Sequence, residues 1–145
     1  MPDIRHRIEI AAPLESVYEA AATPEGVAGW WSRDGVSGDA AVGSRLEFRF
    51  GRPDPAAVVE ITRLDPAGHV AWRCVEGPAD WVGTDIAFDM SELDGRTVLL
   101  FAHDGWREQT EFMAHCSARW AYFMLSLKSL VESGRGTPHP EDLKF

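Results

Sequence analysis

The sequence predicts an α+β domain in which a curved antiparallel sheet wraps around one long C-terminal helix. Two observations carry this prediction. The middle of the chain holds short runs in which apolar residues alternate with polar ones, and turn-forming residues separate these runs. The stretch from Glu108 to Ser133 contains no glycine or proline and repeats apolar residues at helical spacing. An amphipathic helix of this length has to bury its apolar side against the sheet.

Composition and charge limit the class of protein. The chain has 145 residues, of which 45% are apolar and 26% charged, so it resembles an ordinary globular protein and not a disordered one. This length accommodates one domain. We expect residues 1–134 to form that domain and residues 135–145 to form an irregular C-terminal tail. The net charge of −9 repels phosphate backbones, so nucleic acid is not an expected partner.

The sequence also bears on cellular location. No window reaches the roughly 18 consecutive apolar residues that a bilayer span needs, so we expect no membrane insertion. The first ten residues alternate charges with isoleucine and do not resemble a signal peptide, which predicts a cytoplasmic protein. Cys74 and Cys116 lack CxxC spacing and are expected to be reduced and buried. Arginine outnumbers lysine and asparagine is absent, a bias typical of a GC-rich bacterial genome.

The N-terminal part predicts one strand followed by two short helices. Residues 4–10 alternate in the manner of a half-buried strand, and Pro13 ends this strand and opens a helix. Thr23 before Pro24 provides the cap and the first residue of a second short helix, which ends near residues 29–31.

The central part predicts an antiparallel meander. Its last two strands flank Asp94-Gly95, a strong signal for a tight hairpin. The expected strands lie around residues 46–50, 59–61, 70–74, 86–90 and 99–103.

The long helix is expected to turn one apolar stripe toward the concave side of the sheet. Glu111, His115 and Ser129 should face outward, and Gly134 can end the helix with a positive φ. The two surfaces diverge at one end when a long helix lies in a curved sheet, so a cavity is a natural product of this fold. The predicted stripe consists of Phe112, Cys116, Trp120, Phe123, Leu127 and Val131.

Several short motifs follow one another along nearly the whole chain. They are Ile8-x-Ile10-x-Ala12-Pro13-x-Glu15-x-Val17-Tyr18, Gly29-Trp30-Trp31, Trp81-x-Gly83-Thr84, Phe101-x-His103-x-Gly105-Trp106, Trp120, Ser126-Leu127-Lys128 and Glu132-x-Gly134-x-Gly136-x-Pro138. In this order and spacing they resemble the START-like, or SRPBCC, superfamily, in the branch named after the C-terminal domain of the heat-shock protein 90 ATPase activator. The resemblance implies a helix-grip fold with a hydrophobic cavity that relatives use for lipids, polyketides and other apolar small molecules.

We therefore expect the chain to bind an apolar or aromatic small molecule between the long helix and the sheet. His103 shares strand parity with the inward-facing residues and is either the polar anchor of the ligand or a core histidine with satisfied hydrogen bonds. The predicted ligand-binding residues are Trp30, Phe48, Trp72, Phe88, Phe101, His103, Trp120 and Phe123.

Other chemistry finds little support in the motifs. HxxxH, HExxH and GxSxG are all absent, so we expect no metal, no cofactor and no catalytic residue. Two alternatives stay open. One is a cyclase-like or hydratase-like enzyme in which His103 or Tyr122 moves a proton inside the cavity. The other is a chaperone-linked adaptor that uses its surface. A homodimer is compatible with each of these hypotheses.

Overall fold

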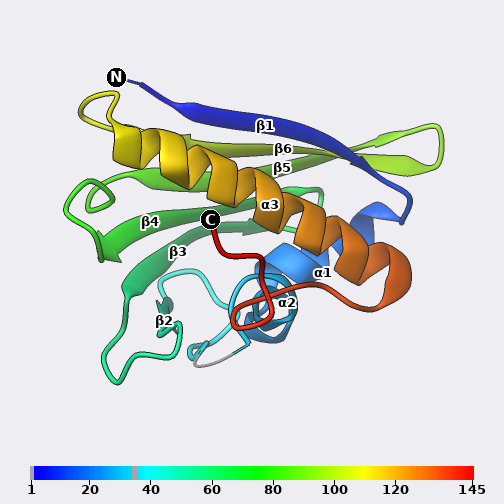
Figure 1. Cartoon of the computed structure of the whole chain (residues 1–145). Coiled ribbons are helices and arrows are strands. Elements are labelled where there is room, and N and C mark those ends of the chain that lie inside the picture. Colours follow the sequence, from blue (N-terminus) through cyan, green and yellow to red (C-terminus); the bar gives the residue numbers. More distant parts are fainter. Residues whose placement is uncertain (1, 34–35) are drawn as a thin grey trace.

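The computed structural model describes residues 2–33 and 36–145, which form one six-stranded sheet and three helices (Figure 1). None of the described helices combines the length and apolar character that a membrane span requires. In chain order the elements are β1 (Ile4–Ile10), α1 (Leu14–Ala22), α2 (Pro24–Trp30), β2 (Arg45–Phe48), β3 (Ala57–Asp65), β4 (His69–Glu76), β5 (Asp85–Leu93), β6 (Arg96–Asp104) and α3 (Glu111–Ser133).

The sheet is antiparallel throughout, with the strand order β1-β6-β5-β4-β3-β2. The predicted hairpin is confirmed as β5–β6, in which Leu93 pairs with Arg96. Its two turn residues, Asp94 and Gly95, have φ values of 51° and 78°. Left-handed backbone at both positions is what a two-residue type I′ turn requires, and Asp-Gly tolerates it.

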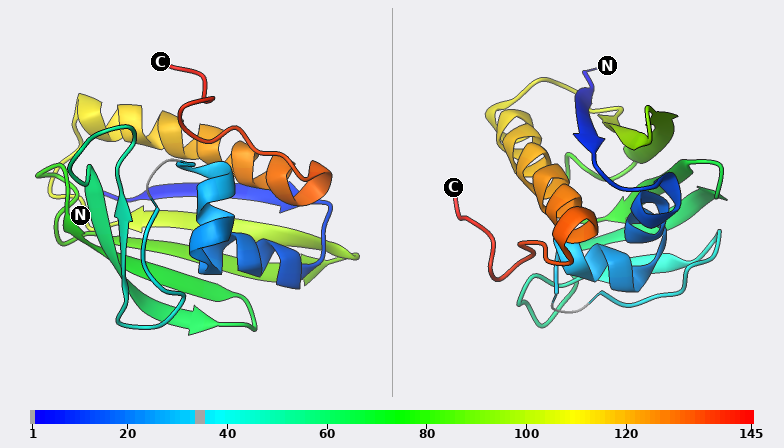
Figure 2. Two further views of the ribbon diagram at one scale, coloured as in Figure 1. Left: turned by 90° about the horizontal axis from the view of Figure 1, so that it is seen from below. Right: turned by 90° about the vertical axis from the view of Figure 1, so that its right-hand side faces the viewer.

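Helix α3 lies along one face of the sheet, and the sheet bends around it (Figure 2). Two irregularities in the β3–β4 register, after Val58 and after Ile61, contribute to this bend, because bulges increase local twist. Helices α1 and α2 cover the end of the sheet beside the C-terminal half of α3 (Figure 1). The predicted helix-grip architecture is therefore confirmed.

Two glycines let the C-terminal tail and α2 approach α3 closely. A Cβ atom on Gly29 would lie 2.8 Å from Leu130 Cδ2, and a Cβ atom on Gly136 would lie 2.4 Å from the Gly29 carbonyl oxygen. Larger residues would force these segments apart. The tail, residues 135–145, has no helix or strand, yet its start is fixed against both α2 and α3.

The predicted buried stripe of α3 is wrong at its N-terminal end. Phe112 is 37% exposed, whereas Met113 beside it is buried, and Val131 is half-buried. The physical reason is the helical repeat of about 100° per residue. Eight residues separate Phe112 from Trp120 and rotate it about 80° away, whereas seven residues place Met113 within about 20° of Trp120. Glu111 and His115 are exposed as predicted, and Ser129 is half-buried.

The phase of α3 can be tested with neighbouring positions. Met124 is fully buried and Leu125 is 56% exposed. We expect Met124→Ala to lower the free energy of unfolding by about 2–5 kcal/mol, because it leaves a cavity in the core. Leu125→Ala should change it by less than about 0.5 kcal/mol. Urea unfolding of both variants measures the difference, and equal losses would contradict the phase described here.

Candidate functional site

A cavity of about 250 Å³ lies at one end of the helix-sheet interface and is partly open to solvent. Its walls come from the N-terminal half of α3, the start of β3, the loop between β4 and β5 and the residue that follows α2. The lining residues are mostly apolar. They are Trp31, Phe50, Ala56, Ala57, Pro78, Trp81, Phe112, His115, Cys116, Arg119, Trp120 and Phe123.

Three tryptophans form the main wall of this cavity. The Trp81 ring stacks on Trp31 at 6.3 Å and on Trp120 at 5.9 Å between centroids, and Trp31 and Trp120 are 4.8 Å apart. The three rings come from three separate segments of the chain, and all are buried to at least nine-tenths. Such a wall presents flat aromatic surface to a ligand.

A chain of hydrogen bonds behind the wall fixes two of these tryptophans. Trp120 Nε1 donates to His103 Nδ1 at 3.1 Å. Because an indole nitrogen can only donate, this bond leaves the imidazole proton on Nε2. His103 Nε2 then donates to Thr84 Oγ1 at 2.7 Å, and the Thr84 hydroxyl donates to the Trp81 carbonyl oxygen at 2.5 Å.

Burial lowers the pKa of His103 to about 4. The side chain is fully buried between the rings of Trp81 and Trp106, whose centroids lie 5.0 and 4.9 Å from the imidazole. A second proton on Nδ1 would also face the Trp120 N–H and break that hydrogen bond. His103 is therefore a neutral residue that positions the wall and does not touch the cavity.

The eight predicted ligand-binding residues divide into two groups. Trp120 and Phe123 line the cavity. The other six are buried but are packed behind it in the core, where they fill the space under the middle of α3 with mutual ring contacts such as Phe88 to Phe101 at 5.3 Å. These six are Trp30, Phe48, Trp72, Phe88, Phe101 and His103.

Several cavity residues escaped the sequence analysis because they lie outside regular elements. Ala56, Pro78 and Trp81 sit in the loops that flank β3 and β4, where no periodicity reports the direction of a side chain. Phe50 was expected inside a strand over residues 46–50, but β2 ends at Phe48 and leaves it in the following loop. The double tryptophan after Gly29 was the one available signal for Trp31. Helix α2 ends between the two rings, so Trp30 turns inward and donates to the Ala20 carbonyl at 2.8 Å, and Trp31 faces the cavity.

The polar groups of the lining are mainly hydrogen-bond donors. Three buried indole nitrogens, those of Trp72, Trp81 and Trp106, have no hydrogen-bond partner among the described residues, and the indole of Trp81 lies close to the Cys116 thiol. Arg119 is a permanent cation, and no carboxylate belongs to the described lining. Burial raises the pKa of the Cys116 thiol, and the Trp81 indole lowers it only in part, so the sulfur is not a nucleophile at neutral pH. The described residues hold no cluster of three His, Cys, Asp or Glu side chains suited to a metal ion.

Comparisons with known proteins give a family and a fold. The family model described as Activator of Hsp90 ATPase homolog 1-like protein matches residues 11–132. The solution structure of the Aha1 dimer from Colwellia psychrerythraea shares 40% sequence identity, with a TM-score of 0.83, and the match covers 94% of this chain and 100% of that one. A search of curated protein sequences gave no match.

Two more distant structures share the fold alone. The protein SSP2350 from Staphylococcus saprophyticus is 22% identical over 93% of this chain and 95% of that chain, with a TM-score of 0.73. CalU16 from Micromonospora echinospora is 20% identical over 97% of this chain and 71% of that chain, with a TM-score of 0.75.

The buried histidine predicts a specific pH dependence of stability. The pKa of His103 in the unfolded chain is about 6.5. Between about pH 6.5 and 4 this side chain is therefore protonated in the unfolded state and neutral in the folded state. Stability is therefore fully present above pH 6.5 and falls as the pH is lowered toward 4, by about 3 kcal/mol from this residue. Urea unfolding from pH 7 to pH 4 measures the loss. His103→Gln removes the titration, so its pH curve should be flatter than that of the wild type, and parallel curves would contradict the assignment.

Proposed function

The chain belongs to the Activator of Hsp90 ATPase homolog 1-like family, and we propose that it binds an apolar or aromatic small molecule in the cavity beside α3. The family assignment confirms the resemblance seen in the sequence motifs. The observation that supports the proposal best is the wall of Trp31, Trp81 and Trp120. An apolar ring that lies against these three indoles removes water from the wall.

The size of the cavity limits the ligand. A volume of about 250 Å³ is just below the usual range for small-molecule sites, which run from roughly 300 to 1,000 Å³. One ring or two fused rings fit inside such a space, and a further ring can project through its open mouth. Burial of one aromatic ring is worth about 1.5–3 kcal/mol, so two rings against this wall supply about 3–6 kcal/mol, which corresponds to millimolar to tens-of-micromolar affinity before the cost of association.

The enzyme alternative lacks its two suggested proton carriers at this site. His103 is neutral, lies behind the wall and has both ring nitrogens in hydrogen bonds. The Tyr122 hydroxyl is outside the lining and accepts from the Leu143 backbone N–H at 2.9 Å. Neither group reaches a molecule in the cavity, so binding is the function that this geometry supports best.

A second candidate function is that of a chaperone-linked adaptor. It is favoured by the family description and by the 40% identical relative, which is named as an Aha1 dimer. By the same likeness we propose that this chain forms a homodimer. An increased ATPase rate of a heat-shock protein 90 chaperone on addition of the protein supports the adaptor role. Native mass spectrometry gives the oligomeric state and, after extraction, the identity of any co-purifying ligand, which supports the binding function.

Filling the mouth of the cavity tests the binding function directly. Ala56 is half-buried at the rim and Ala118 is exposed on α3 outside the lining. We expect N-phenyl-1-naphthylamine to bind the wild type with a rise in fluorescence. Ala56→Trp should weaken binding by about tenfold or more, because the new ring takes the space of one ligand ring.

The matched control is Ala118→Trp, which adds the same ring elsewhere and should leave the affinity unchanged. If the dye fails to saturate on the wild type, or if both variants bind it as the wild type does, the cavity is not a binding site. The chaperone ATPase assay should be unaffected by Ala56→Trp, which separates the two candidate functions.

A further inference from the structure

The C-terminal tail turns back from α3 toward the cavity. Its first part is fixed by hydrogen bonds from Thr137 N to Ser126 Oγ at 2.7 Å and from His139 N to the Trp31 carbonyl oxygen at 2.9 Å. Trp31 belongs to the cavity wall, and the His139 ring also stands edge-on against the cavity residue Phe50 at 5.6 Å. The tail thus reaches the rim of the cavity before it continues along α3.

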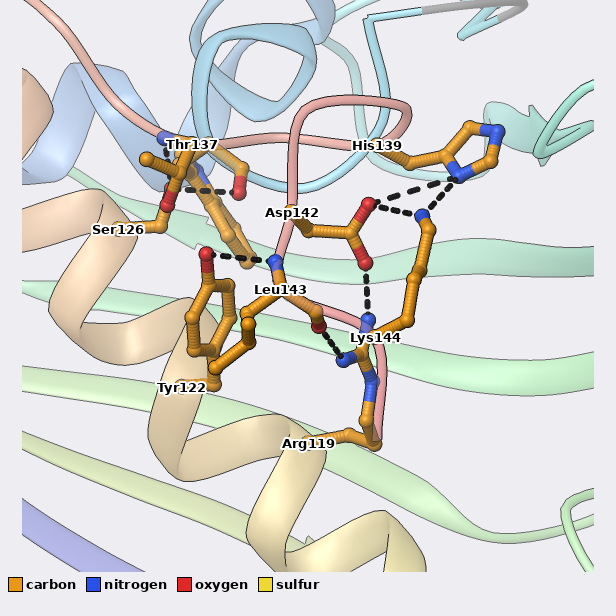
Figure 3. A network of polar contacts seen from close by, with 9 residues as sticks. Arg119, Tyr122, Ser126, Thr137, His139, Asp142, Leu143 and Lys144 are labelled. Atoms are coloured by element: carbon orange, nitrogen blue, oxygen red, sulfur yellow. Dashed lines mark hydrogen bonds and ion pairs between the residues drawn. The ribbon is translucent and has the colours of Figure 1, made fainter.

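The end of the tail places a buried carboxylate on the one arginine of the lining (Figure 3). The Asp142 side chain is only 1% exposed and forms ion pairs with Arg119 and Lys144, and His139 Nδ1 lies 3.7 Å from it. Arg119 also donates to the Leu143 carbonyl oxygen at 2.6 Å. Burial would raise the pKa of Asp142, but hydrogen bonds from Lys144 and Arg119 outweigh burial and lower it, so the group is charged at neutral pH.

Aromatic rings lie close to the guanidinium of Arg119. It lies 4.8 Å from the centroid of the Phe123 ring, which lines the cavity, and 4.7 Å from that of Phe145, near the end of the tail. Arg119 therefore stands between the cavity and the tail, with its charge available to a carboxylate from either side. A bidentate pair with a carboxylate is the strongest contact that an arginine makes.

We propose that Arg119 is the anchor for an acidic group on the ligand, and that Asp142 occupies this anchor until the ligand replaces it. The proposal rests on the binding function above and narrows the ligand to an apolar or aromatic carboxylate. The absence of carboxylates from the described lining, together with the positive charge of Arg119, fits this class. The protein's net charge of −9 does not prevent it, because distant charges are screened beyond about 8 Å whereas the guanidinium acts at contact.

The exchange keeps every charge paired. When a ligand carboxylate pairs with Arg119, Asp142 keeps its ion pair with Lys144 and moves toward solvent. No buried charge is then left without a partner. The contacts that the end of the tail loses are local: the bonds from Arg119 to Leu143 and from Leu143 to the Tyr122 hydroxyl, and the ring contacts of Phe145 with Arg119, Tyr122 and His115. The first part of the tail, bonded to Ser126 and Trp31, can stay in place.

The test compares 2-naphthoate with 2-naphthamide, which have the same shape and differ in charge. Isothermal titration calorimetry measures the affinity of each. We expect Arg119→Met to weaken naphthoate by about tenfold or more and to change naphthamide little, since only naphthoate uses the charge. Asp142→Asn should strengthen naphthoate several-fold and leave naphthamide unchanged, because it removes the competing carboxylate.

The chain offers matched controls in the exposed ion pair between Arg33, which follows α2, and Glu141, which belongs to the tail, and both residues lie outside the lining. Arg33→Met and Glu141→Gln make the same changes of charge and should alter neither affinity. A further measurement needs no variant. Naphthoate, but not naphthamide, should speed hydrogen exchange of the Leu143 amide in the wild type, because its bond to Tyr122 is released.

The outcomes separate this proposal from the binding function. The proposal is wrong if naphthoate binds neither the wild type nor Asp142→Asn. It is also wrong if Asp142→Asn and Glu141→Gln change the naphthoate affinity equally. An unchanged Leu143 amide on naphthoate binding also overturns it. Binding of naphthamide or N-phenyl-1-naphthylamine in those cases leaves the binding function standing, and binding of none of the three compounds removes both.

Discussion

The structure depends on one buried neutral imidazole. His103 sits on β6, accepts a hydrogen bond from Trp120 on α3 and donates to Thr84, which in turn bonds to the backbone of Trp81. These bonds join the helix, the sheet and the β4–β5 loop, the three parts that surround the cavity. A hydrophobic residue at this position would fill the volume but would leave an indole N–H buried without an acceptor, which is costly. The polar chain therefore sets where the helix and loop stand, and apolar packing supplies the stability.

The cavity lies off-centre because large aromatic side chains fill the middle of the interface. Under the centre of α3, Phe88 contacts both Trp72, at 5.0 Å, and Phe101, at 5.3 Å, edge to face. Close packing there leaves no room for a ligand. Toward the N-terminal half of α3 the wall is made by loops, which pack less regularly than strands. The candidate binding site therefore lies at the place where the close packing of the core ends. Its position does not depend on a special set of catalytic groups.

The sequence predicted the features that periodicity and turn chemistry control. The β5–β6 hairpin at Asp94-Gly95 and the long helix with its fold class were predicted, since each depends on local residues. The inward face of α3 was misjudged at Phe112 because steps of four drift away from the true helical repeat. Loop residues such as Trp81 were missed because a loop has no period. The buried Asp142 was missed because its partner Arg119 is distant in sequence.

The tail adds a constraint on affinity that the cavity alone does not have. A carboxylate on the same chain competes with any ligand acid at a high effective concentration, typically millimolar or above. The ion pair with Arg119 is therefore exchanged when an acidic ligand binds, so the displacement of Asp142 offsets part of its free energy. The rest of the favourable binding free energy has to come from burial of apolar surface against Trp31, Trp81 and Trp120. An acid without a ring loses this competition, and a ring without an acid leaves the tail in place. Selectivity for molecules that carry both follows from placing one arginine between the cavity and the tail.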